Sequence, residues 1–363
     1  MSHLVPLAEL PGGKKVYSVR GQKFEIDKRY DLIKVVGFGA YGTVCSAICN
    51  DSGERVAIKR LARVFGDLRE GKRILREMEI MTSLKHTNLI RLHHFMRPQS
   101  KETFEDMYLV MDLYDTDLNR IIRSRQKLTD EHLQYFMIQA FRGLHYLHSA
   151  KVMHRDLKPS NLLVNADCAL AICDFGLARD DDVMSSSDLT QYVVTRWYRP
   201  PEILGMGSNQ YTSAVDVWSL GLIFGELMVG RTLLPGTDYI AQLVMIINLL
   251  GSPCMEDMEF LSPAAKTFIL SQPHRAAIPF KDIFPMATPE AVDLLSKLLV
   301  FHPARRLTAK QVMEHPYFSK FRDATEEADA PHPFVWNHSH IETAEQLRED
   351  LWRVVDAHSA PNE

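Results

Sequence analysis

The chain has 363 residues, 46% of them hydrophobic, and its formal net charge at pH 7 is −4. This length suggests two compact units or one domain with two lobes, and it is ample for a large buried core. The near-neutral charge argues against nucleic acid as a main partner, because surfaces that bind nucleic acid are usually strongly basic.

The cysteines and the apolar segments indicate the cellular compartment. Five cysteines without a Cys-x-x-Cys pair predict free thiols in a reducing environment. The N-terminus has no apolar signal segment, and the most apolar stretch, residues 239–250, is too short to span a bilayer. We therefore expect a cytoplasmic protein that can also enter the nucleus, without membrane insertion.

The first third of the chain predicts mainly strands. Residues 1–25 mix Pro, Gly and Lys without periodicity, so we expect a loose lead-in there. From Tyr30 on, β-branched runs separated by turn signals predict an antiparallel meander. The expected strands lie at 30–36, 43–49, 56–58 and 107–111. Residues 68–84 predict the one main helix of this part, with Ile74, Met78 and Met81 on one face.

After residue 112 the pattern becomes mostly helical. Thr129 is a candidate N-cap for a long helix with an apolar stripe that begins at Leu133. Further helices are expected near 213–229, 238–250, 289–299 and 308–314. Thr343 and Gln346 fit a capping box, so the tail should end in a helix whose apolar stripe must be buried.

These elements predict an α+β fold with two lobes. Residues 26–112 would form a small lobe, an antiparallel β-sheet with one main helix. Residues 113–319 would form a larger, mainly α-helical lobe. Residues 320–363 would be a C-terminal extension with an acidic patch and a helix that packs back on the small lobe.

The first motif with chemical meaning is glycine-rich. Residues 37–44 read Gly-Phe-Gly-Ala-Tyr-Gly-Thr-Val. Glycines at such a bend let backbone N–H groups approach phosphate oxygens without Cβ clashes. The same spacing opens the dinucleotide-binding folds of oxidoreductases, but it leads into a helix there, whereas here β-branched residues and a turn follow. An ordinary hairpin remains an alternative for this motif alone.

The second motif is Lys59 at the end of Val-Ala-Ile-Lys, on the third expected strand. Glu77 follows eighteen positions later (77 − 59), on the expected helix 68–84. An ammonium group held by a carboxylate can fix the α- and β-phosphates of a nucleotide. The alternatives are a surface lysine and pairing with Glu79, which would face elsewhere on the helix.

The third motif is polar and follows the long helix. Residues 154–161 read His-Arg-Asp-Leu-Lys-Pro-Ser-Asn, and Asp174-Phe175-Gly176 begins thirteen residues after Asn161 (174 − 161). Polar side chains beside apolar neighbours are costly unless they have partners. A buried structural network is the alternative to a catalytic loop.

In this order the motifs resemble the protein-kinase signature, over about residues 30–318. The resemblance implies a bilobal kinase with ATP in the cleft. It implies that Asp156 orients the substrate hydroxyl and accepts its proton, and that Lys158 neutralises the γ-phosphate. By the same pattern, Asn161 and Asp174 hold two Mg²⁺ ions, and Lys59 with Glu77 positions the nucleotide.

The resemblance also implies supporting residues. By this resemblance, Thr195 is also expected to be a catalytic residue. Asp216 would support the catalytic loop, and Arg306 would pair with Glu202. The implied ATP contacts are Val36, Gly37, Gly39, Ala40, Tyr41, Gly42, Val44, Ala57, Lys59, Met111, Asp112, Tyr114, Asp117, Ser160, Leu163 and Cys173.

The segment between Asp174 and Glu202 resembles the activation lip of mitogen-activated protein kinases. It contains Thr190-Gln191-Tyr192, where this family has a Thr-x-Tyr pair that an upstream dual-specificity kinase phosphorylates. With Gln191 in the middle, this Thr-Gln-Tyr lip resembles that of kinases from kinetoplastid parasites. The resemblance implies receiving arginines for the two phosphates, namely Arg73, Arg76, Arg155 and Arg179 for Thr190, and Arg196 and Arg199 for Tyr192. Arg199 would then shape a site for proline after the target Ser or Thr.

Asp323, Glu326 and Glu327 fall where this family carries an acidic docking patch. Such a patch binds basic peptides of activators, phosphatases and substrates, whereas a solvated acidic tail is the alternative. The sequence thus predicts a proline-directed serine/threonine kinase that uses ATP and Mg²⁺, activated by dual phosphorylation in a MAP kinase cascade and expected to be a monomer. A kinase-like scaffold without activity is the rival, although Lys59, Asp156, Asn161 and Asp174 are all present.

Overall fold

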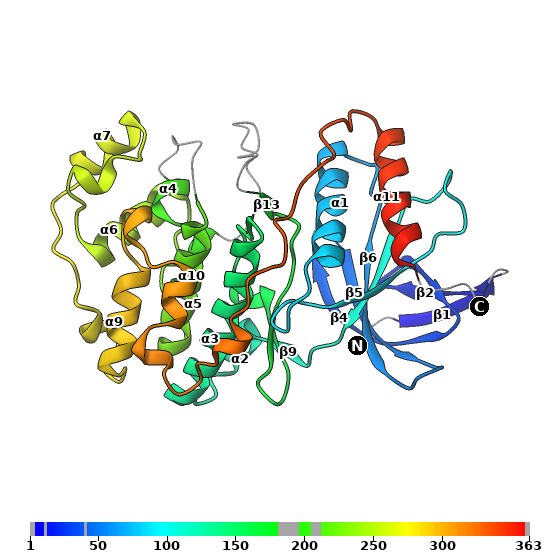
Figure 1. Cartoon of the computed structure of the whole chain (residues 1–363), viewed down its shortest axis with the longest axis horizontal. Coiled ribbons are helices and arrows are strands. Elements are labelled where there is room, and N and C mark those ends of the chain that lie inside the picture. The colour runs from blue at the N-terminus through cyan, green and yellow to red at the C-terminus, as the bar shows by residue number, and fades with distance from the viewer. Residues whose placement is uncertain (1–3, 11–12, 40–41, 181–195, 205–211, 360–363) are drawn as a thin grey trace. The chain divides into compact units, whose positions relative to one another are not determined.

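The computed structural model describes residues 4–10, 13–39, 42–180, 196–204 and 212–359 (Figure 1). The chain separates into two compact units. Unit 1 comprises Met1–Tyr114 and Trp336–Glu363, and unit 2 comprises Asp115–Val335. The first boundary lies two residues after the expected one. The expected extension 320–363 is divided, because residues 320–335 belong to unit 2.

Unit 1 contains a five-stranded antiparallel sheet in the order β4-β5-β6-β8-β7. Its strands are β4 (Tyr30–Gly39), β5 (Gly42–Cys49), β6 (Arg55–Leu61), β7 (Leu92–Met96) and β8 (Met107–Asp112). Consecutive residues of β5 and β6 are buried, as Cys45, Ser46 and Ala47 and then Ala57 and Ile58 show. Because successive side chains of a strand point to opposite faces, both faces of the sheet are covered at this place.

The prediction of a loose lead-in over residues 1–25 is wrong. A three-stranded antiparallel sheet forms there from β1 (Leu4–Leu10), β2 (Lys14–Val19) and β3 (Gln22–Asp27). Phe24 and Ile26 are fully buried, and the ring of Phe24 packs edge-on against Tyr108 of β8, with centroids 5.2 Å apart. The partner lies more than 80 residues along the chain, so local composition could not reveal it.

Two helices of unit 1 lie side by side, α1 (Leu68–Ser83) and α11 (Ala344–His358) (Figure 1). Asp67 caps α1 by accepting the N–H groups of Arg69 and Glu70. Gly71 allows α11 to approach closely, because a Cβ at this position would lie 2.2 Å from Leu347 Cδ2. Thr343 and Gln346 form the expected capping box of α11.

Unit 2 is mainly helical. Its helices are α2 (Leu118–Ser124), α3 (Asp130–Ser149), α4 (Pro201–Leu204), α5 (Ala214–Val229), α6 (Tyr239–Leu250), α7 (Pro263–Ser271), α8 (Phe280–Ile283), α9 (Pro289–Leu298) and α10 (Ala309–Met313). The short strands are β9 (Thr116–Asp117), β10 (Val152–Met153), β11 (Leu162–Val164), β12 (Leu170–Ile172) and β13 (Arg179–Asp180). The 3-10 turns are η1 (Pro159–Asn161), η3 (Arg196–Tyr198), η4 (Glu256–Met258), η5 (Pro303–Arg305), η6 (Pro316–Phe318) and η7 (Ala324–Glu326).

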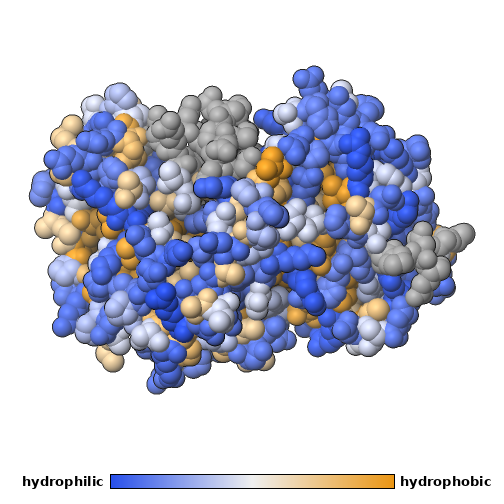
Figure 2. All heavy atoms as spheres, viewed as in Figure 1, coloured by the Kyte–Doolittle hydropathy of each residue, from blue (hydrophilic) through white to orange (hydrophobic). Residues whose placement is uncertain are grey.

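The core of unit 2 surrounds α5, with Trp218 completely buried. The predicted α+β class is confirmed, with an antiparallel sheet unit and a mostly helical unit. Among the described residues, each helix is too short or too polar to cross a bilayer. Hydrophilic residues cover most of the face drawn in Figure 2, with apolar residues in scattered groups.

Candidate active site

The catalytic loop expected from the sequence is anchored by the buried carboxylate of Asp216. One carboxylate oxygen accepts the backbone N–H of His154 at 2.8 Å, and the other accepts that of Arg155 at 2.7 Å. His148 Nε2 lies 2.9 Å from the same carboxylate. The loop is therefore held by its backbone at the residues that directly precede Asp156.

The charge of Asp216 is maintained although its side chain is 0% exposed. Burial alone would raise the pKa of this carboxyl, but the hydrogen bond and charge of His148 and the charge of His154 hold the pKa below its ordinary range. An ionised carboxylate is the stronger acceptor for backbone N–H groups, so this electrostatic environment fixes the loop.

Asp156, Lys158 and Asn161 form a compact polar cluster. Lys158 Nζ lies 2.6 Å from Asp156 Oδ2, and the Asn161 amide donates to the Asp156 carbonyl at 2.9 Å. That bond uses the NH₂ end of the amide, so its oxygen is the end that can serve as a cation ligand. Burial raises the pKa of Asp156, against the opposing charge of Lys158, and a raised pKa suits a residue that accepts a proton.

Asp174 is tied to the same loop through the backbone. The N–H of Cys173 donates to the Asn161 carbonyl at 3.0 Å, and His154 Nε2 lies 3.0 Å from the Cys173 carbonyl. Asp174 has φ of 70°, a strained value for a residue other than glycine. Its negative charge adds to the raised pKa of Asp156. The carboxylate of Asp174 and the amide oxygen of Asn161 are hard donors that fit a divalent cation such as Mg²⁺.

The remaining expected nucleotide contacts of unit 2 lie on adjoining elements. Ser160 is in η1, Leu163 is in β11, and Asp117 pairs with Leu163 in the β9–β11 register. Cys173 follows β12 and is half-buried. The structure therefore brings these residues together around the loop that carries Asp156.

In unit 1, the expected pairing of Lys59 with Glu77 is confirmed. Lys59 Nζ on β6 lies 2.5 Å from Glu77 Oε1 on α1, and Glu77 is only 3% exposed. The competing residue Glu79 faces elsewhere and contacts His338 Nε2 at 2.6 Å. Lys59 is thus held by a helix that the tail of the chain also contacts.

The glycine-rich segment is the bend of a hairpin, since β5 follows it directly. Gly39 and Gly42 face one another in the β4–β5 register. Gly42 has φ of 146°, and a Cβ there would lie 2.1 Å from the Arg60 carbonyl oxygen. The helix required by a dinucleotide-binding loop is absent from this place, so that alternative is wrong. Ala40 and Tyr41 lie outside the described residues.

The other expected nucleotide contacts of unit 1 lie on the strands that flank this bend. Val36 and Gly37 are on β4, Val44 is on β5, and Ala57 on β6 pairs with Met111 on β8. Asp112 ends β8, and Tyr114 follows it.

Asp112 is paired with two basic side chains of unit 1. Burial would raise the pKa of Asp112, but His93 at 2.7 Å and Arg91 at 3.0 Å hold it below its ordinary value. The carboxylate therefore stays ionised at the end of β8.

Thr190, Gln191, Tyr192 and Thr195 lie outside the described residues. Arg179 pairs with Met153 through its backbone in β13, but its side chain also lies outside the described part. Two other expected phosphate-binding arginines are on α1. Arg73 contacts Glu70 at 2.7 Å, and the guanidinium of Arg76 stacks over the Trp336 ring at 4.0 Å.

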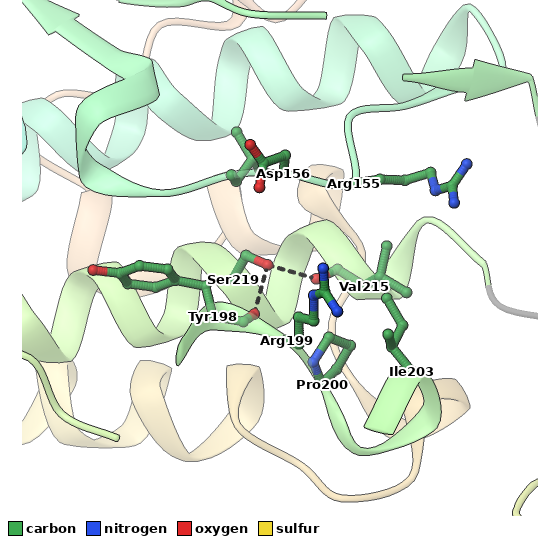
Figure 3. A pocket seen from close by; sticks show the side chains of 9 residues that line it. Arg155, Asp156, Tyr198, Arg199, Pro200, Ile203, Val215 and Ser219 are labelled. Atoms are coloured by element: carbon green, nitrogen blue, oxygen red, sulfur yellow. Dashed lines mark hydrogen bonds between the residues drawn. The ribbon is translucent and has the colours of Figure 1, made fainter. Parts of the chain in front are cut away.

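A pocket of unit 2 adjoins Asp156 (Figure 3). It is lined by catalytic-loop residues, by residues from the end of η3 to α4, and by α5. Ser219 donates to the carbonyls of Tyr198 and Val215, which fixes one wall. The lining residues are Arg155, Asp156, Leu157, Tyr198, Arg199, Pro200, Ile203, Val215 and Ser219.

Tyr239 organises the two arginines beside this pocket. Arg199 donates to the Tyr239 hydroxyl at 2.7 Å, and its guanidinium lies 5.6 Å from the ring. The Arg196 guanidinium lies 5.1 Å from the same ring. Two of the expected phosphate-binding arginines therefore converge on one side chain.

The three expected docking carboxylates lie in and beside η7. Glu326 pairs with Arg142, Glu327 pairs with Arg322 at 3.1 Å, and Asp323 accepts hydrogen bonds from Thr325. Two of the three carboxylates therefore already have basic partners within unit 2.

The expected scaffold pair of Arg306 and Glu202 is confirmed. The two side chains are bidentate at 2.5 and 2.8 Å and almost completely buried. His148 and Trp336 could not be identified from the sequence, because their contacts with Asp216 and Arg76 join residues far apart in the chain.

A catalytic loop anchored by a buried aspartate, a Lys–Glu pair and a glycine hairpin define a protein kinase. Residues 30–318 match the family described as protein kinase domain. The chain is 45% identical over 341 residues to mitogen-activated protein kinase 13 of Arabidopsis thaliana, which covers 93% of both chains. It is 46% identical over 347 residues to mitogen-activated protein kinase 6 of Oryza sativa subsp. japonica, or 94% of this chain and 91% of the relative.

A third relative is extracellular signal-regulated kinase 1 of Dictyostelium discoideum. The identity is 47% over 322 residues, 88% of this chain, and the match spans 61% of the relative's length. The chain belongs to the mitogen-activated protein kinases, which are serine/threonine kinases that use ATP and a divalent metal ion.

Proposed function

We propose that this chain transfers the γ-phosphoryl group of ATP, with Mg²⁺, to serine or threonine followed by proline, and that phosphorylation of Thr190 and Tyr192 activates it. The observation that carries the proposal is the cluster of Asp156, Lys158 and Asn161 on a loop anchored by Asp216. These are the groups that phosphoryl transfer requires, because its chemistry depends on positioning and charge neutralisation.

Each residue of the cluster has one task in this proposal. Asp156 orients the substrate hydroxyl and accepts its proton, for which its raised pKa is suited. Lys158 neutralises charge beside it, and Asn161 and Asp174 hold the metal. When bound, ATP with Mg²⁺ supplies the phosphoryl group and screens its negative charge.

Further residues hold the nucleotide and the substrate. Lys59, fixed by Glu77, binds the α- and β-phosphates. Thr195 assists at the catalytic loop. The pocket beside Asp156 accepts the proline that follows the target residue, and its lining by Arg199, Pro200 and Ile203 supports this role (Figure 3).

Activation would depend on the arginines. Each phosphate adds roughly −1.5 to −2 charges and three strong acceptor oxygens. Within the described residues, Nε and Nη1 of the buried Arg76 lack hydrogen-bond partners, so a phosphate would satisfy them. Arg73, Arg155 and Arg179 would assist at Thr190, and Arg196 and Arg199 would bind phosphorylated Tyr192.

The partners follow from the same proposal. An upstream dual-specificity kinase would phosphorylate the lip, whose Thr-Gln-Tyr sequence relates it to kinases of kinetoplastid parasites. Basic peptides of activators, phosphatases and substrates would bind at Asp323, Glu326 and Glu327, in competition with the Arg142 and Arg322 pairs. We place the protein in the cytoplasm and the nucleus.

The test is a kinase assay on the protein phosphorylated at Thr190 and Tyr192, as checked by mass spectrometry. We expect Mg²⁺-dependent phosphorylation of a Ser-Pro peptide, little with the Ser-Ala peptide, and a large loss after phosphatase treatment. Asp156→Asn should lower kcat by roughly 10²–10⁴-fold, since it removes the proton acceptor. The control Asp167→Asn, on an exposed turn, should retain activity. Full activity of Asp156→Asn would contradict the proposal.

A further inference from the structure

Two histidines of the tail converge on a buried carboxylate of α11. His338 Nδ1 lies 2.6 Å from Asp350 Oδ2, and His340 Nε2 lies 3.0 Å from the same oxygen. Asp350 is only 1% exposed. The other carboxylate oxygen contacts Arg353 at 2.7 Å, so Oδ2 is the one that faces both imidazoles. The three donor atoms lie within 4.8 Å of one another.

The fold brings these residues together from two segments. His338 and Ile341 close a turn through an N–H to carbonyl bond of 3.3 Å, and the buried Ile341 side chain anchors it. Asp350 lies in the second turn of α11, which packs against α1 (Figure 1). The ligand positions are therefore set by packed elements rather than by an unsupported loop.

The contact with Glu79 determines which nitrogen of His338 carries a proton. His338 Nε2 lies 2.6 Å from Glu79 Oε1 on α1, so this nitrogen donates. The Nδ1 lone pair then faces a carboxylate oxygen at 2.6 Å, which requires a positive centre: a proton at this separation, or a metal ion once the two atoms move apart. A histidine that binds a metal commonly donates its other N–H to a carboxylate in this way.

We propose that His338, His340 and Asp350 form a binding site for Zn²⁺, with Glu79 orienting His338 from α1. Two imidazole nitrogens and one carboxylate oxygen are the donor set of a borderline divalent metal, whereas Mg²⁺ prefers oxygen ligands. In a tetrahedral site with ligand distances of about 2.0–2.2 Å, donor atoms lie about 3.3–3.6 Å apart, so each imidazole nitrogen must move away from Asp350 Oδ2 by about 1 Å or less. The half-exposed side of His340 leaves a coordination position for water.

The site would join three segments of unit 1. The turn at 338–341 and α11 supply the ligands, and Glu79 extends the link to the helix that carries Glu77. His338 also packs against Trp336, with ring centroids 4.8 Å apart. Bound metal would therefore hold the tail on α1. This inference does not depend on kinase activity.

The test uses the full-length protein stripped of metal with a chelator. We expect isothermal titration calorimetry at pH 7.5 to show one Zn²⁺ equivalent that His340→Gln loses, with excess Mg²⁺ present throughout. The matched control His332→Gln, at an exposed tail position outside the cluster, should keep that equivalent. Zn²⁺ should raise the Tm of the wild type and of His332→Gln but not that of His340→Gln.

A second variant tests the orienting role of the carboxylate on α1. Glu79→Gln should weaken Zn²⁺ binding by roughly 10–100-fold, the usual effect of losing a carboxylate behind a ligating histidine. His340 is half-exposed, so its replacement should leave the fold intact, which circular dichroism checks. Equal Zn²⁺ stoichiometry and affinity in the wild type and His340→Gln would overturn the proposal. So would wild-type protein without a Zn²⁺ equivalent, which would show that only a proton occupies the site.

Discussion

In unit 2, the buried carboxylates of Asp216 and Glu202 are bound by rigid partners. Asp216 accepts two backbone N–H groups, and Glu202 receives both arms of the Arg306 guanidinium. In unit 1, Glu77 and Asp350 are similarly buried, but their partners include the long side chain of Lys59 and two imidazole rings. The loop that carries Asp156 is therefore anchored through its own backbone, whereas the position of Lys59 depends on how α1 is held.

The largest effect is expected from breaking the rigid pair of unit 2. Arg306→Ala should lower the free energy of unfolding by about 3–5 kcal/mol, because Glu202 would keep a buried charge without its partner. Its neighbour Arg305 is the matched control, since it is half-exposed and pairs with Asp257 at the surface. Arg305→Ala should cost about 0–1 kcal/mol. Equal losses in urea unfolding would contradict the comparison.

The second prediction concerns the helix contact of unit 1. Gly71→Ala should destabilise the protein by about 1–3 kcal/mol, because the added methyl group would overlap both Leu347 of α11 and the Val64 carbonyl oxygen. The sign is decisive, since Ala instead of Gly inside an unobstructed helix stabilises by about 0.5–1 kcal/mol.

Thermal unfolding gives the sign of this change, and hydrogen exchange should show weaker protection of α11. Lys72→Ala, the next position of α1, should leave both unchanged. A stabilised Gly71→Ala protein would show that α11 packs less tightly on α1 than the structure indicates.

The paired carboxylates Glu202 and Glu77 and the carboxylate of Asp350 also differ in how far the sequence predicted their partners. Arg306, Glu202, Lys59 and Glu77 lie in motifs of fixed order, so their pairs could be predicted through the family resemblance. The period-2 pattern and the caps likewise placed β4, β5, β6 and β8 and the longer helices, because they depend on local backbone geometry. The site of Asp350 could not be predicted in this way, because its histidine partners come together only when the C-terminal tail packs on α1.

The prediction of a loose lead-in over residues 1–25 was wrong for a related reason. Phe24 and Ile26 alternate with polar residues as a half-buried strand requires, but the lysines and glycines around them favoured a loop. The strand is stabilised by burial of Phe24 against Tyr108, which is distant in the sequence. The sequence also did not predict that the C-terminal extension, residues 320–363, divides after residue 335. Residues 320–335 belong to unit 2, where the Phe334 N–H donates to the Ala150 carbonyl at 2.8 Å.

The smallest effect concerns the response of the two units to acid. His94 on β7 lies 3.2 Å from the Tyr30 hydroxyl, and burial, with the charge of Arg29, lowers its pKa from 6.5 to about 4. The unfolded chain therefore binds a proton at higher pH than the folded chain. The stability that neutral His94 contributes is fully present above pH 6.5 and is lost as the pH falls towards about 4.

Asp216 behaves differently, because its pKa is lowered. The stability that its charge contributes is retained until the pH falls below the ordinary carboxylate pKa of 3.8. Between pH 7 and pH 5, the stability contributed by His94 should therefore decrease while the anchor of the catalytic loop remains charged. We expect the wild type to lose about 1 kcal/mol more than His94→Gln over this range, since the partly exposed site reduces the full linkage effect. Urea unfolding at both pH values measures this difference, and identical losses would show that His94 is not the acid-sensitive group of unit 1.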